Sequence, residues 1–494
     1  MSVLAVKLDA LARQDFRDGR AYLAGGWQTG AETIMVEDPA TGETVGQVAA
    51  MAPDDADAAV AAAEAAFPAW RRLLPAARGA ILRRWAAAIR CHTADLAVLM
   101  TAEQGKPLAE AGAEIAYAAS FLDWFAAEGE RAYGETIPAH KANSLVHVRM
   151  QPIGVTAAVT PWNFPCAMIV RKAAAALAAG CPMIVVPAAE TPFSALALAR
   201  LALEAGIPAN VLQVITGPAG PLVGRLLTHA TVRALSFTGS TEIGRMLLGR
   251  SADTVRKVSL ELGGHAPFIV FDDAGVETAV AGALAAKFTT SGQDCLAANR
   301  IYVQRGIYPQ FLAQFGQAAG ALRVGHGFDP ASAIGPMTRV QVADKCRAQI
   351  DDAVGNGARL VTGGSAKLGR DTFVRPTVLG EVTDAMLITR QETFGPVAAV
   401  LPFATEDEVI RRANDSELGL AAYLYTCDLR RALRISEALE YGMVGVNTAS
   451  FTGPPIPFGG WKQSGLGREG SRHGLAEYME LKYVCFGDLA ASGE

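Results

Sequence analysis

Short apolar runs alternate with helix-length segments through the middle of the chain. The short runs have the length and composition of buried strands, and they lie at 155–160, 183–186, 211–215 and 234–237. Between them, residues 167–179 and 192–205 are predicted helices, and Gly180 after the first is a typical helix stop. Strand and helix in turn, joined by short loops, predict a parallel sheet of the doubly wound type.

A second run of the same kind begins after Gly264. Residues 266–270 and 300–303 are predicted strands, residues 276–288 a predicted helix, and the alternation continues to 445–447. A chain of 494 residues is too long for one hydrophobic core. We therefore expect two α/β domains with a boundary near residue 262, and a return of the chain to the first domain near residue 450.

Three segments outside these runs have other patterns. Residues 54–90 predict two or three helices, because Pro68 and Pro75 interrupt the helical spacing of apolar residues. Residues 145–150 alternate in polarity like an exposed strand. The apolar tail at 481–486 is also strand-like, and an exposed apolar strand needs a partner.

Composition and charge narrow the class of protein. Hydrophobic residues make up 51% of the chain and charged residues 19%, which is typical of globular proteins. The net charge of −5 provides no basic surface, so we expect no nucleic-acid partner. The sequence shows neither an apolar run long enough to span a membrane nor a signal peptide, so we expect no membrane partner.

The seven cysteines are scattered and include no Cys-x-x-Cys pair. We expect no metal site and no disulfide framework, and a reducing, cytoplasmic location is the simplest one. Cys295 stands out because the Gly292-Gln293 pair before it predicts an irregular loop that exposes the sulfur. A free cysteine is usually a buried structural residue, whereas an accessible thiolate is a nucleophile. Glu261, which two glycines follow closely, is either a candidate general base or a solvated surface carboxylate.

Motifs along nearly the whole chain resemble the aldehyde dehydrogenase superfamily. Besides the segments around Glu261 and Cys295, they lie at 38–43, 103–107, 160–165, 237–240, 392–396, 457–460 and 464–469. Each motif alone is a weak signal, but all of them in order are not expected by chance.

The resemblance implies an α/β fold of two doubly wound, Rossmann-like parallel-sheet domains plus a small β oligomerisation element. Residues 1–134 and 155–262 are expected to form the NAD(P)-binding domain, and residues 263–450 the catalytic domain. Residues 135–154 and 478–494 are the expected oligomerisation strands. The implied protein partner is a second copy of the chain, in a homodimer or a homotetramer.

The resemblance also implies a reaction and its residues. Cys295 attacks the carbon of an aldehyde substrate to give a thiohemiacetal, hydride passes to the nicotinamide, and water hydrolyses the resulting thioester. Asn163 and the backbone N–H of Cys295 form the oxyanion hole, Glu261 is the general base, and Lys172 lies on a proton pathway. From pattern alone, Asn163 is equally a turn-forming asparagine and Lys172 a helix lysine that extends to solvent.

Residues 239–244 follow a predicted strand and open a predicted helix, where backbone N–H groups favour phosphate. Taken alone they are better interpreted as an ordinary turn, because the Gly-x-Gly-x-x-Gly pattern is absent. By resemblance, the cofactor contacts are Thr160, Pro161, Trp162, Val186, Gly239, Ser240, Gly244, Leu262, Glu392 and Phe394.

One cofactor position departs from the family pattern. The family usually has lysine where this chain has Val186, and many NAD-preferring members have glutamate where it has Ala189. Valine neither donates a hydrogen bond nor carries charge, so a 2′-phosphate loses its obvious counter-charge. We therefore predict NAD as the preferred cofactor and NADP as the alternative, unless a nearby arginine or lysine replaces the lost charge.

Within the superfamily the chain is most similar to succinate-semialdehyde dehydrogenases. Arg171 matches one of their substrate arginines and suits a terminal carboxylate, although on pattern alone it is equally a solvated helix arginine. Thr289 stands where a second substrate arginine is expected, and Phe451 lies in a loop that usually carries smaller residues. A carboxylated semialdehyde such as succinate semialdehyde is the expected substrate, with a longer or neutral aliphatic or aromatic aldehyde as the alternative.

Three other classes are weaker interpretations. A CoA-acylating relative usually lacks the glutamate that this chain has at 261. A non-catalytic family member is expected to lose Cys295 or Glu261, and only Val186 points in that direction. An unrelated thiol hydrolase needs a histidine near Cys295, and the seven histidines form no motif.

Overall fold

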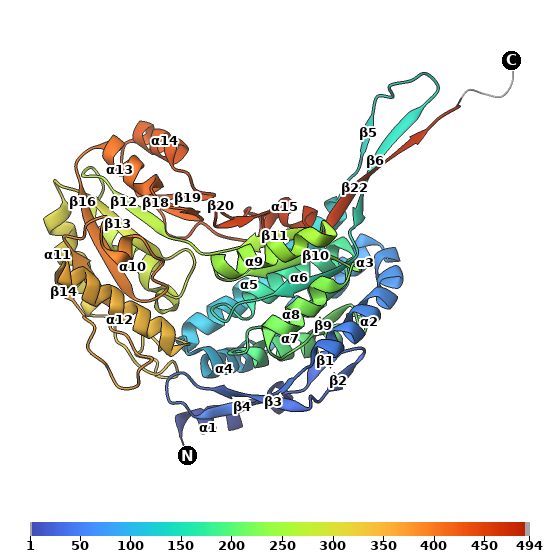
Figure 1. Ribbon diagram of the computed structural model, residues 1–494, viewed down its shortest axis with the longest axis horizontal. Helices are drawn as coiled ribbons and strands as arrows, with labels where there is room; N and C mark the ends of the chain where they lie inside the picture. Colours follow the sequence, from blue (N-terminus) through green and yellow to red (C-terminus); the bar gives the residue numbers. More distant parts are fainter. Residues whose placement is uncertain (1, 490–494) are drawn as a thin grey trace.

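The computed structural model describes residues 2–489 and shows an α/β protein of two parallel-sheet domains with a projecting β arm (Figure 1). The expected fold class is thereby confirmed. Helices cover the two large sheets, and the central parallel strands of both are almost wholly buried, as parallel sheets require.

The first sheet has eight strands in the order β2-β1-β9-β8-β7-β10-β11-β21. The five strands from β9 to β11 pair in parallel, while β1 and β21 join antiparallel at either side. The last strand comes from far along the chain, so the chain does return to this sheet after the second domain. The strands are β1 (Ala21–Leu23), β2 (Gly26–Gln28), β7 (Val155–Val159), β8 (Met183–Val186), β9 (Leu212–Val214), β10 (Val232–Thr238), β11 (Lys257–Glu261) and β21 (Gly465–Leu466).

Most helices of the chain's first half surround this sheet. The predicted helix interruption at Pro75 is confirmed, but the one at Pro68 is wrong, because α2 runs through that proline. Pro68 is exposed and so is Glu64 one turn earlier, which lets water solvate the carbonyl that proline leaves unbonded. The helices are α2 (Pro53–Arg72), α3 (Pro75–Cys91), α4 (Thr93–Gln104), α5 (Leu108–Glu128), α6 (Ala167–Ala179), α7 (Pro192–Glu204), α8 (Ala219–Thr228) and α9 (Thr241–Ser251).

Helix α6 matters most for the site, because all of its residues are buried. Its alanines permit close packing against α5 and the sheet, and Gly180 ends it with a φ of +100° that disfavours other residues. A fully buried helix carries its two charged residues, Arg171 and Lys172, into the interior. Buried charges need partners, so these two side chains demand an internal carboxylate.

The second sheet has seven strands in the order β14-β15-β16-β13-β12-β18-β19 and is parallel except at β14. Its strands are β12 (Ala266–Val270), β13 (Ala298–Gln304), β14 (Arg359–Thr362), β15 (Thr377–Gly380), β16 (Val397–Phe403), β18 (Ala421–Tyr425) and β19 (Met443–Val446). The accompanying helices are α10 (Val276–Phe288), α11 (Tyr308–Gly320), α12 (Val340–Gly355), α13 (Glu406–Asn414) and α14 (Leu429–Ala438).

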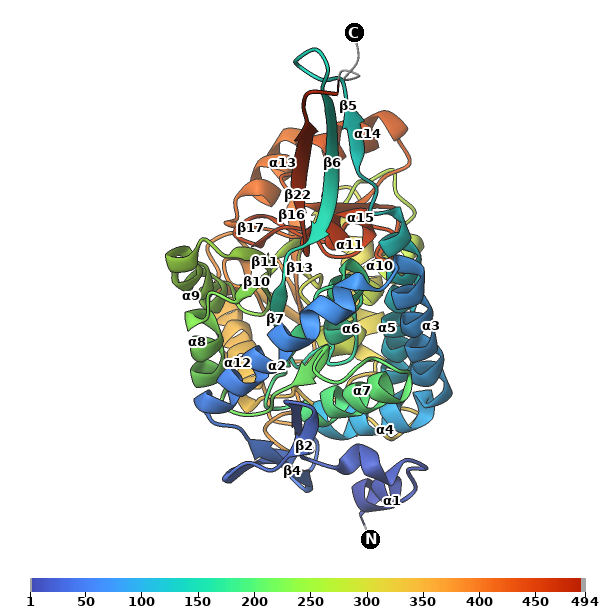
Figure 2. The ribbon, with the colours of Figure 1, turned by 90° about the vertical axis from the view of Figure 1, so that its right-hand side faces the viewer.

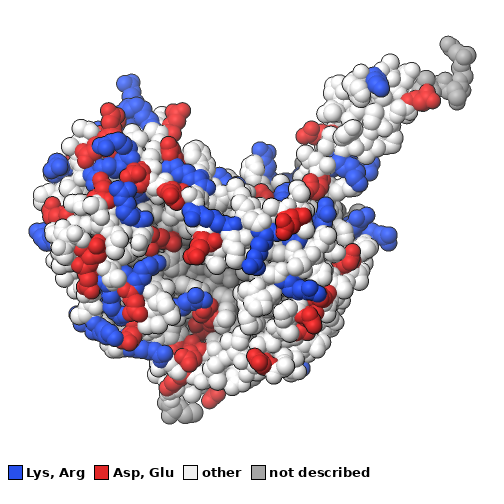
Figure 3. Space-filling view, viewed as in Figure 1, with Lys and Arg blue, Asp and Glu red and all other residues white. Residues whose placement is uncertain are grey.

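The projecting arm is a three-stranded antiparallel sheet in the order β22-β6-β5 (Figure 2). It joins β22 (Met479–Phe486) to β6 (Leu145–Pro152), which in turn pairs with β5 (Glu135–Ile137). The tail thus finds the partner strand that its apolar pattern demanded. Leu481 and Tyr483 remain 71% exposed, and the face shown in Figure 3 carries few charges on the arm. Its role in oligomerisation stays a prediction, and residues 490–494 of that predicted element lie outside the described residues.

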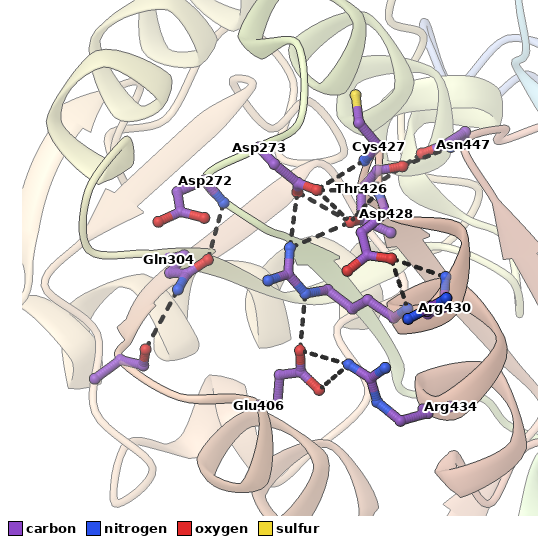
Figure 4. Close-up of polar contacts among 12 residues, drawn as sticks. Asp272, Asp273, Gln304, Glu406, Thr426, Cys427, Asp428, Arg430, Arg434 and Asn447 are labelled. Atoms are coloured by element: carbon purple, nitrogen blue, oxygen red, sulfur yellow. Dashed lines mark hydrogen bonds and ion pairs between the residues drawn. The ribbon is translucent and has the colours of Figure 1, made fainter.

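A polar cluster joins the loops after β12 and β18 (Figure 4). The carboxylate of Asp273 accepts hydrogen bonds from the Thr426 hydroxyl at 2.8 and 2.9 Å and from the backbone N–H groups of Cys427 and Asp428. Arg431 bridges Asp273 to Glu406 on α13. This cluster fixes in place the turn that carries the exposed Cys427.

Candidate active site

A cavity of about 620 Å³ lies between the two domains, where the surface in Figure 3 is hollowed. One wall follows the carboxyl ends of β7 and β10, and the other follows the loops around Cys295 and Glu392. The carboxyl ends of parallel strands are where doubly wound folds bind ligands.

No helix among residues 2–489 is long and apolar enough to cross a membrane.

Cys295 reaches this cavity from a strained turn. Thr290, Ser291 and Gly292 before it all have positive φ, and a Cβ on Gly292 would lie 2.4 Å from the carbonyl oxygen of Gly395. The turn therefore requires glycine at 292, and it directs Cys295 to the cavity wall. Burial raises the pKa of the Cys295 thiol well above its usual value, and the negative charge of Asp294 raises it further.

Asn163 lies opposite, in the loop between β7 and α6. Its side-chain Nδ2 donates to the backbone carbonyl of Gln293 at 2.9 Å, so it sits beside the turn that carries Cys295. Its own backbone carbonyl accepts from Lys106 Nζ at 2.7 Å. Asn163 is buried and lines the cavity, which places an amide donor next to the sulfur-bearing loop.

The motif at 103–107 acts as the frame of this wall. Buried Lys106 pairs with buried Glu114, whose second oxygen accepts from the N–H groups of Cys166 and Ala167 at 2.9 and 3.1 Å. These contacts fix both ends of the Asn163 loop. Removing one member of such a buried pair typically costs about 3–5 kcal/mol, because the other charge is left unpaired.

Glu261 ends β11 deep in the interior, and its two carboxylate oxygens find no hydrogen-bond partner among the described residues. Burial raises the pKa of this carboxyl well above its usual value, and the nearby charge of Glu469 raises it further. A Cβ on Gly459 would lie only 2.9 Å from Glu261 Oε1, so the carboxylate needs glycine there. The side chain is not itself on the cavity wall.

Arg171 and Lys172 find their internal carboxylate in Glu469. Lys172 Nζ bonds the Glu469 carboxylate and the Ser236 hydroxyl, and Arg171 Nη1 lies 3.2 Å from Glu469 Oε2. Burial raises the pKa of Glu469, but these two cations outweigh it and leave that pKa below the usual value. Nothing in the sequence singles out Glu469 within its motif, because only the fold brings it to α6.

Of this pair, Arg171 alone lines the cavity. Its guanidinium lies 4.3 Å from the ring centroid of Phe458 and 5.1 Å from that of Phe121. These rings hold the planar group in place, and its Nε has no partner among the described residues.

The residues expected to hold a dinucleotide also gather here. Pro161, Trp162, Gly239, Ser240 and Leu262 line the cavity, together with Glu392 and Phe394 from the other domain. Trp162 and Phe394 meet edge to face with ring centroids 5.4 Å apart, and Glu392 Oε1 accepts from Gly264 N–H at 2.9 Å. Gly244 lies behind the wall, where a Cβ would meet Leu262 at 2.3 Å.

Two observations show that these residues fit a dinucleotide. Ser240 caps α9 by accepting from Ile243 N–H, so the positive end of that helix opens at the cavity, as a phosphate requires. The hydroxyls of Thr160 and Thr238 are buried without a partner among the described residues, and they flank the same strand ends. The Thr160 backbone N–H donates to the carbonyl of Val186 at 3.2 Å. Val186, which stands where the family usually has lysine, therefore lies beside the cavity wall rather than on it.

The second predicted substrate residue lies elsewhere than expected. Phe451 is not on the cavity wall but packs edge to face on Tyr423 at 5.3 Å, whereas its neighbours Ser450 and Thr452 line the cavity. Successive residues of this extended loop point to opposite sides, so Phe451 shapes the loop from behind.

Several lining residues were not foreseen. Asp294, Glu110 and Lys345 all face the cavity. The Glu110 carboxylate accepts from Thr290 N–H at 3.0 Å, and Asp294 Oδ1 accepts from Leu296 N–H at 3.0 Å. Burial raises the pKa of both carboxyls. A carboxylate adjoining the nucleophile was visible in the sequence at 294, but Glu110 and Lys345 come from distant helices.

Two α/β domains with a thiol, an amide donor and a phosphate-favouring helix end around one cavity define a nucleotide-dependent oxidoreductase. Residues 27–484 match the Aldehyde dehydrogenase family, and the chain belongs to it. The resemblance seen in the sequence is confirmed.

Three known proteins show how close the similarity is. The chain is 53% identical to succinate-semialdehyde dehydrogenase [NADP(+)] of Escherichia coli, over 95% of this chain and 98% of the relative. It is 52% identical to glutarate-semialdehyde dehydrogenase of Pseudomonas putida, over 94% and 97%. The crystal structure of an E. coli NADP-dependent enzyme superposes with a TM-score of 0.96 at 52% identity, covering 97% of this chain and all of that one. The predicted preference for NAD gains no support from these relatives, two of which are named for NADP.

Proposed function

We propose that this aldehyde dehydrogenase oxidises its substrate through covalent catalysis at Cys295. The observation that carries the proposal is the single cavity that joins Cys295, Asn163 and the dinucleotide-binding residues. The thiol must lose its proton before attack, since only the thiolate is an effective nucleophile. Attack on the carbonyl carbon forms the carbon–sulfur bond of a thiohemiacetal and places negative charge on the former carbonyl oxygen.

Asn163 stabilises that oxygen together with the backbone N–H of Cys295. In the structure the Asn163 amide already donates to Gln293, so its orientation is set before substrate arrives. Donors that are aimed in advance stabilise developing charge without reorganisation.

Glu261 is the proposed base for hydrolysis of the thioester. Its buried, unpartnered oxygens and raised pKa suit a group that takes a proton from water near neutral pH. Lys172 and Glu469 lie beside it, and we propose that they lead the proton away from the cavity.

An NAD(P) cofactor supplies the hydride acceptor when bound. Trp162, Leu262 and Phe394 provide apolar contacts for it, Gly239 and Ser240 provide the helix end for its phosphates, and Glu392 is placed to accept from a ribose hydroxyl. Val186 supplies no charge to the adenosine end, and on that ground NAD remains our proposed preference over NADP.

The proposed substrate is a carboxylated semialdehyde, such as succinate or glutarate semialdehyde. Arg171 on the cavity wall supports a carboxylate, and two of the relatives are named for such substrates. The other residues at the cavity entrance favour the alternative substrate, a longer or neutral aldehyde. Thr289 provides no charge there, Glu110 and Asp294 are acidic, and Arg171 is already paired with Glu469.

The test is formation of reduced cofactor from aldehydes of graded length, with and without a terminal carboxylate. Wild type should reduce NAD(P) and Cys295→Ala should not, whereas Cys427→Ala, which alters an exposed thiol in a structural turn, should match wild type. Undiminished turnover in Cys295→Ala would refute covalent catalysis at this sulfur. A higher kcat/KM for neutral aldehydes than for semialdehydes would select the alternative substrate.

We also propose a homodimer or homotetramer assembled through the β arm, because its exposed Leu481 and Tyr483 are apolar surface without a cover in the single chain.

A further inference from the structure

An ion pair spans the cleft between the domains near the position of the missing lysine. Arg339, the residue before α12 in the catalytic domain, pairs with Glu190 of the dinucleotide-binding domain. Glu190 lies four positions after Val186, in the turn between β8 and α7. Arg339 is thus a cation close to the position where Val186 replaces the family's lysine, and the sequence alone did not reveal it.

Neither residue is on the cavity wall itself, but both belong to segments that adjoin it. Val186 ends β8 and pairs with Val159 of β7, whose continuation at Pro161 and Trp162 forms the cavity wall. On the other side, α12 contributes Val342 and Lys345 to that wall, within two turns of Arg339. The pair therefore lies at the carboxyl edge of the strands, beyond the phosphate-favouring end of α9.

A single segment of the first domain holds both partners in position. The Glu103 carboxylate accepts from the first N–H groups of α7, those of Phe193 and Ser194, each at 2.8 Å, directly after the turn of Glu190. The next residue, Gln104, accepts from the Thr338 hydroxyl at 2.9 Å through its backbone carbonyl, directly before Arg339. The two ends of the ion pair are thus built in rather than adventitious.

One carboxylate oxygen of Glu190 has no hydrogen-bond partner among the described residues. Arg339 engages Oε1, while Oε2 is buried and has no partner among the described residues. A buried carboxylate oxygen without a donor is unfavourable, and a ribose hydroxyl is a suitable donor.

We propose that Glu190, held by Arg339 across the cleft, accepts a hydrogen bond from the adenosine ribose of the cofactor and thereby selects NAD over NADP. The 2′-phosphate of NADP would be repelled by the Glu190 carboxylate. If Arg339 paired with that phosphate instead, it would leave Glu190, whose carboxylate would then be buried and unpaired. Glu190 thus replaces the contact that Val186 removed. This inference rests on the proposed binding of a dinucleotide.

The test is the equilibrium Kd for NAD and for NADP, measured by isothermal titration in the absence of aldehyde. Wild type should bind NAD about tenfold or more tightly than NADP, in line with one charge-assisted hydrogen bond. Glu190→Gln should weaken NAD binding about tenfold and leave NADP binding within about twofold, with an unchanged Tm. Arg339→Gln should weaken NAD binding severalfold, because Glu190 loses its orientation.

Asp371→Asn is the matched control, since Asp371 forms an exposed pair with Lys367 at 2.8 Å. It should change neither Kd. The proposal is overturned if Glu190→Gln retains wild-type affinity for NAD, or if wild type prefers NADP and Arg339→Gln removes that preference. Binding of NAD without oxidation of any aldehyde would refute the proposed function but not this inference, whereas failure of wild type to bind either dinucleotide would refute both.

Discussion

Asn163 donates from its side-chain amide to the backbone carbonyl of Gln293, 2.9 Å away and two positions before Cys295. This one contact crosses the boundary between the domains. It joins the loop after β7 to the turn that presents the thiol, and Lys106 holds the other side of the same loop.

The first prediction follows from that contact. Asn163→Ala removes the proposed oxyanion donor and should lower kcat about 10²–10³-fold with a much smaller change in cofactor Kd. Steady-state kinetics and titration with NAD(P) measure the two effects. Asn356→Ala, which alters a hydrogen bond to Asp352 at the exposed end of α12, is the control. Equal losses in kcat and cofactor binding would instead indicate a structural role.

The second prediction concerns the base. Glu261→Gln should still form the thioester but should hydrolyse it slowly, because the amide cannot take a proton from water. Stopped-flow mixing should then show a burst of about one reduced cofactor per active site, followed by a rate about 10²-fold or more below wild type. Normal steady-state turnover in this variant would exclude Glu261 as the base.

Glu261 should also make the free energy of unfolding depend on pH. Because burial raises the pKa of Glu261 in the folded state, the folded protein binds an extra proton between the ordinary carboxyl pKa and the raised one. Its contribution to stability is therefore fully present below the unfolded pKa and is lost as the pH rises through the folded pKa. Wild type should therefore lose stability relative to Glu261→Gln as the pH rises above the ordinary carboxyl pKa of about 4.3, in paired denaturant titrations. A difference that does not vary with pH would contradict the raised pKa.

Asp294 should control the reactivity of the free thiol. Its negative charge adds to burial in raising the pKa of Cys295, so Asp294→Asn should lower that pKa. Inactivation by iodoacetamide should reach its half-maximal rate at a lower pH in this variant than in wild type. Asp371→Asn should leave the profile unchanged, and an unshifted profile in Asp294→Asn would show that its charge does not reach the sulfur.

Thr289 offers a gain-of-function test for the substrate. It is exposed and lines the cavity, with its hydroxyl bonded to the Ala285 carbonyl at 2.8 Å. Thr289→Arg adds a fork for a carboxylate and should raise kcat/KM for succinate semialdehyde about tenfold, with little change for butanal. Thr228→Arg, at the exposed end of α8, is the control. No gain with the semialdehyde would show that its carboxylate does not approach position 289.

Local sequence was sufficient for the repeating units of this fold. The strands at 183–186 and 266–270 and the helices at 167–179 and 276–288 have the predicted bounds, because apolar periodicity, glycine stops and short loops act within a few residues. The predicted helix break at Pro68 was wrong, because the free-energy cost of a proline inside a helix depends on whether water can reach the carbonyl that it leaves without a hydrogen bond.

The sequence by itself determined the two α/β domains, the irregular turn at Gly292 before Cys295, and the loss of charge at Val186. Only the tertiary structure decided which distant groups meet these residues. Glu469 reaches α6 from the end of the chain, Arg339 reaches Glu190 from the other domain, and Phe451 turns away from the cavity. Burial and electrostatic pairing arise between segments that are remote in sequence, so no local pattern carries them.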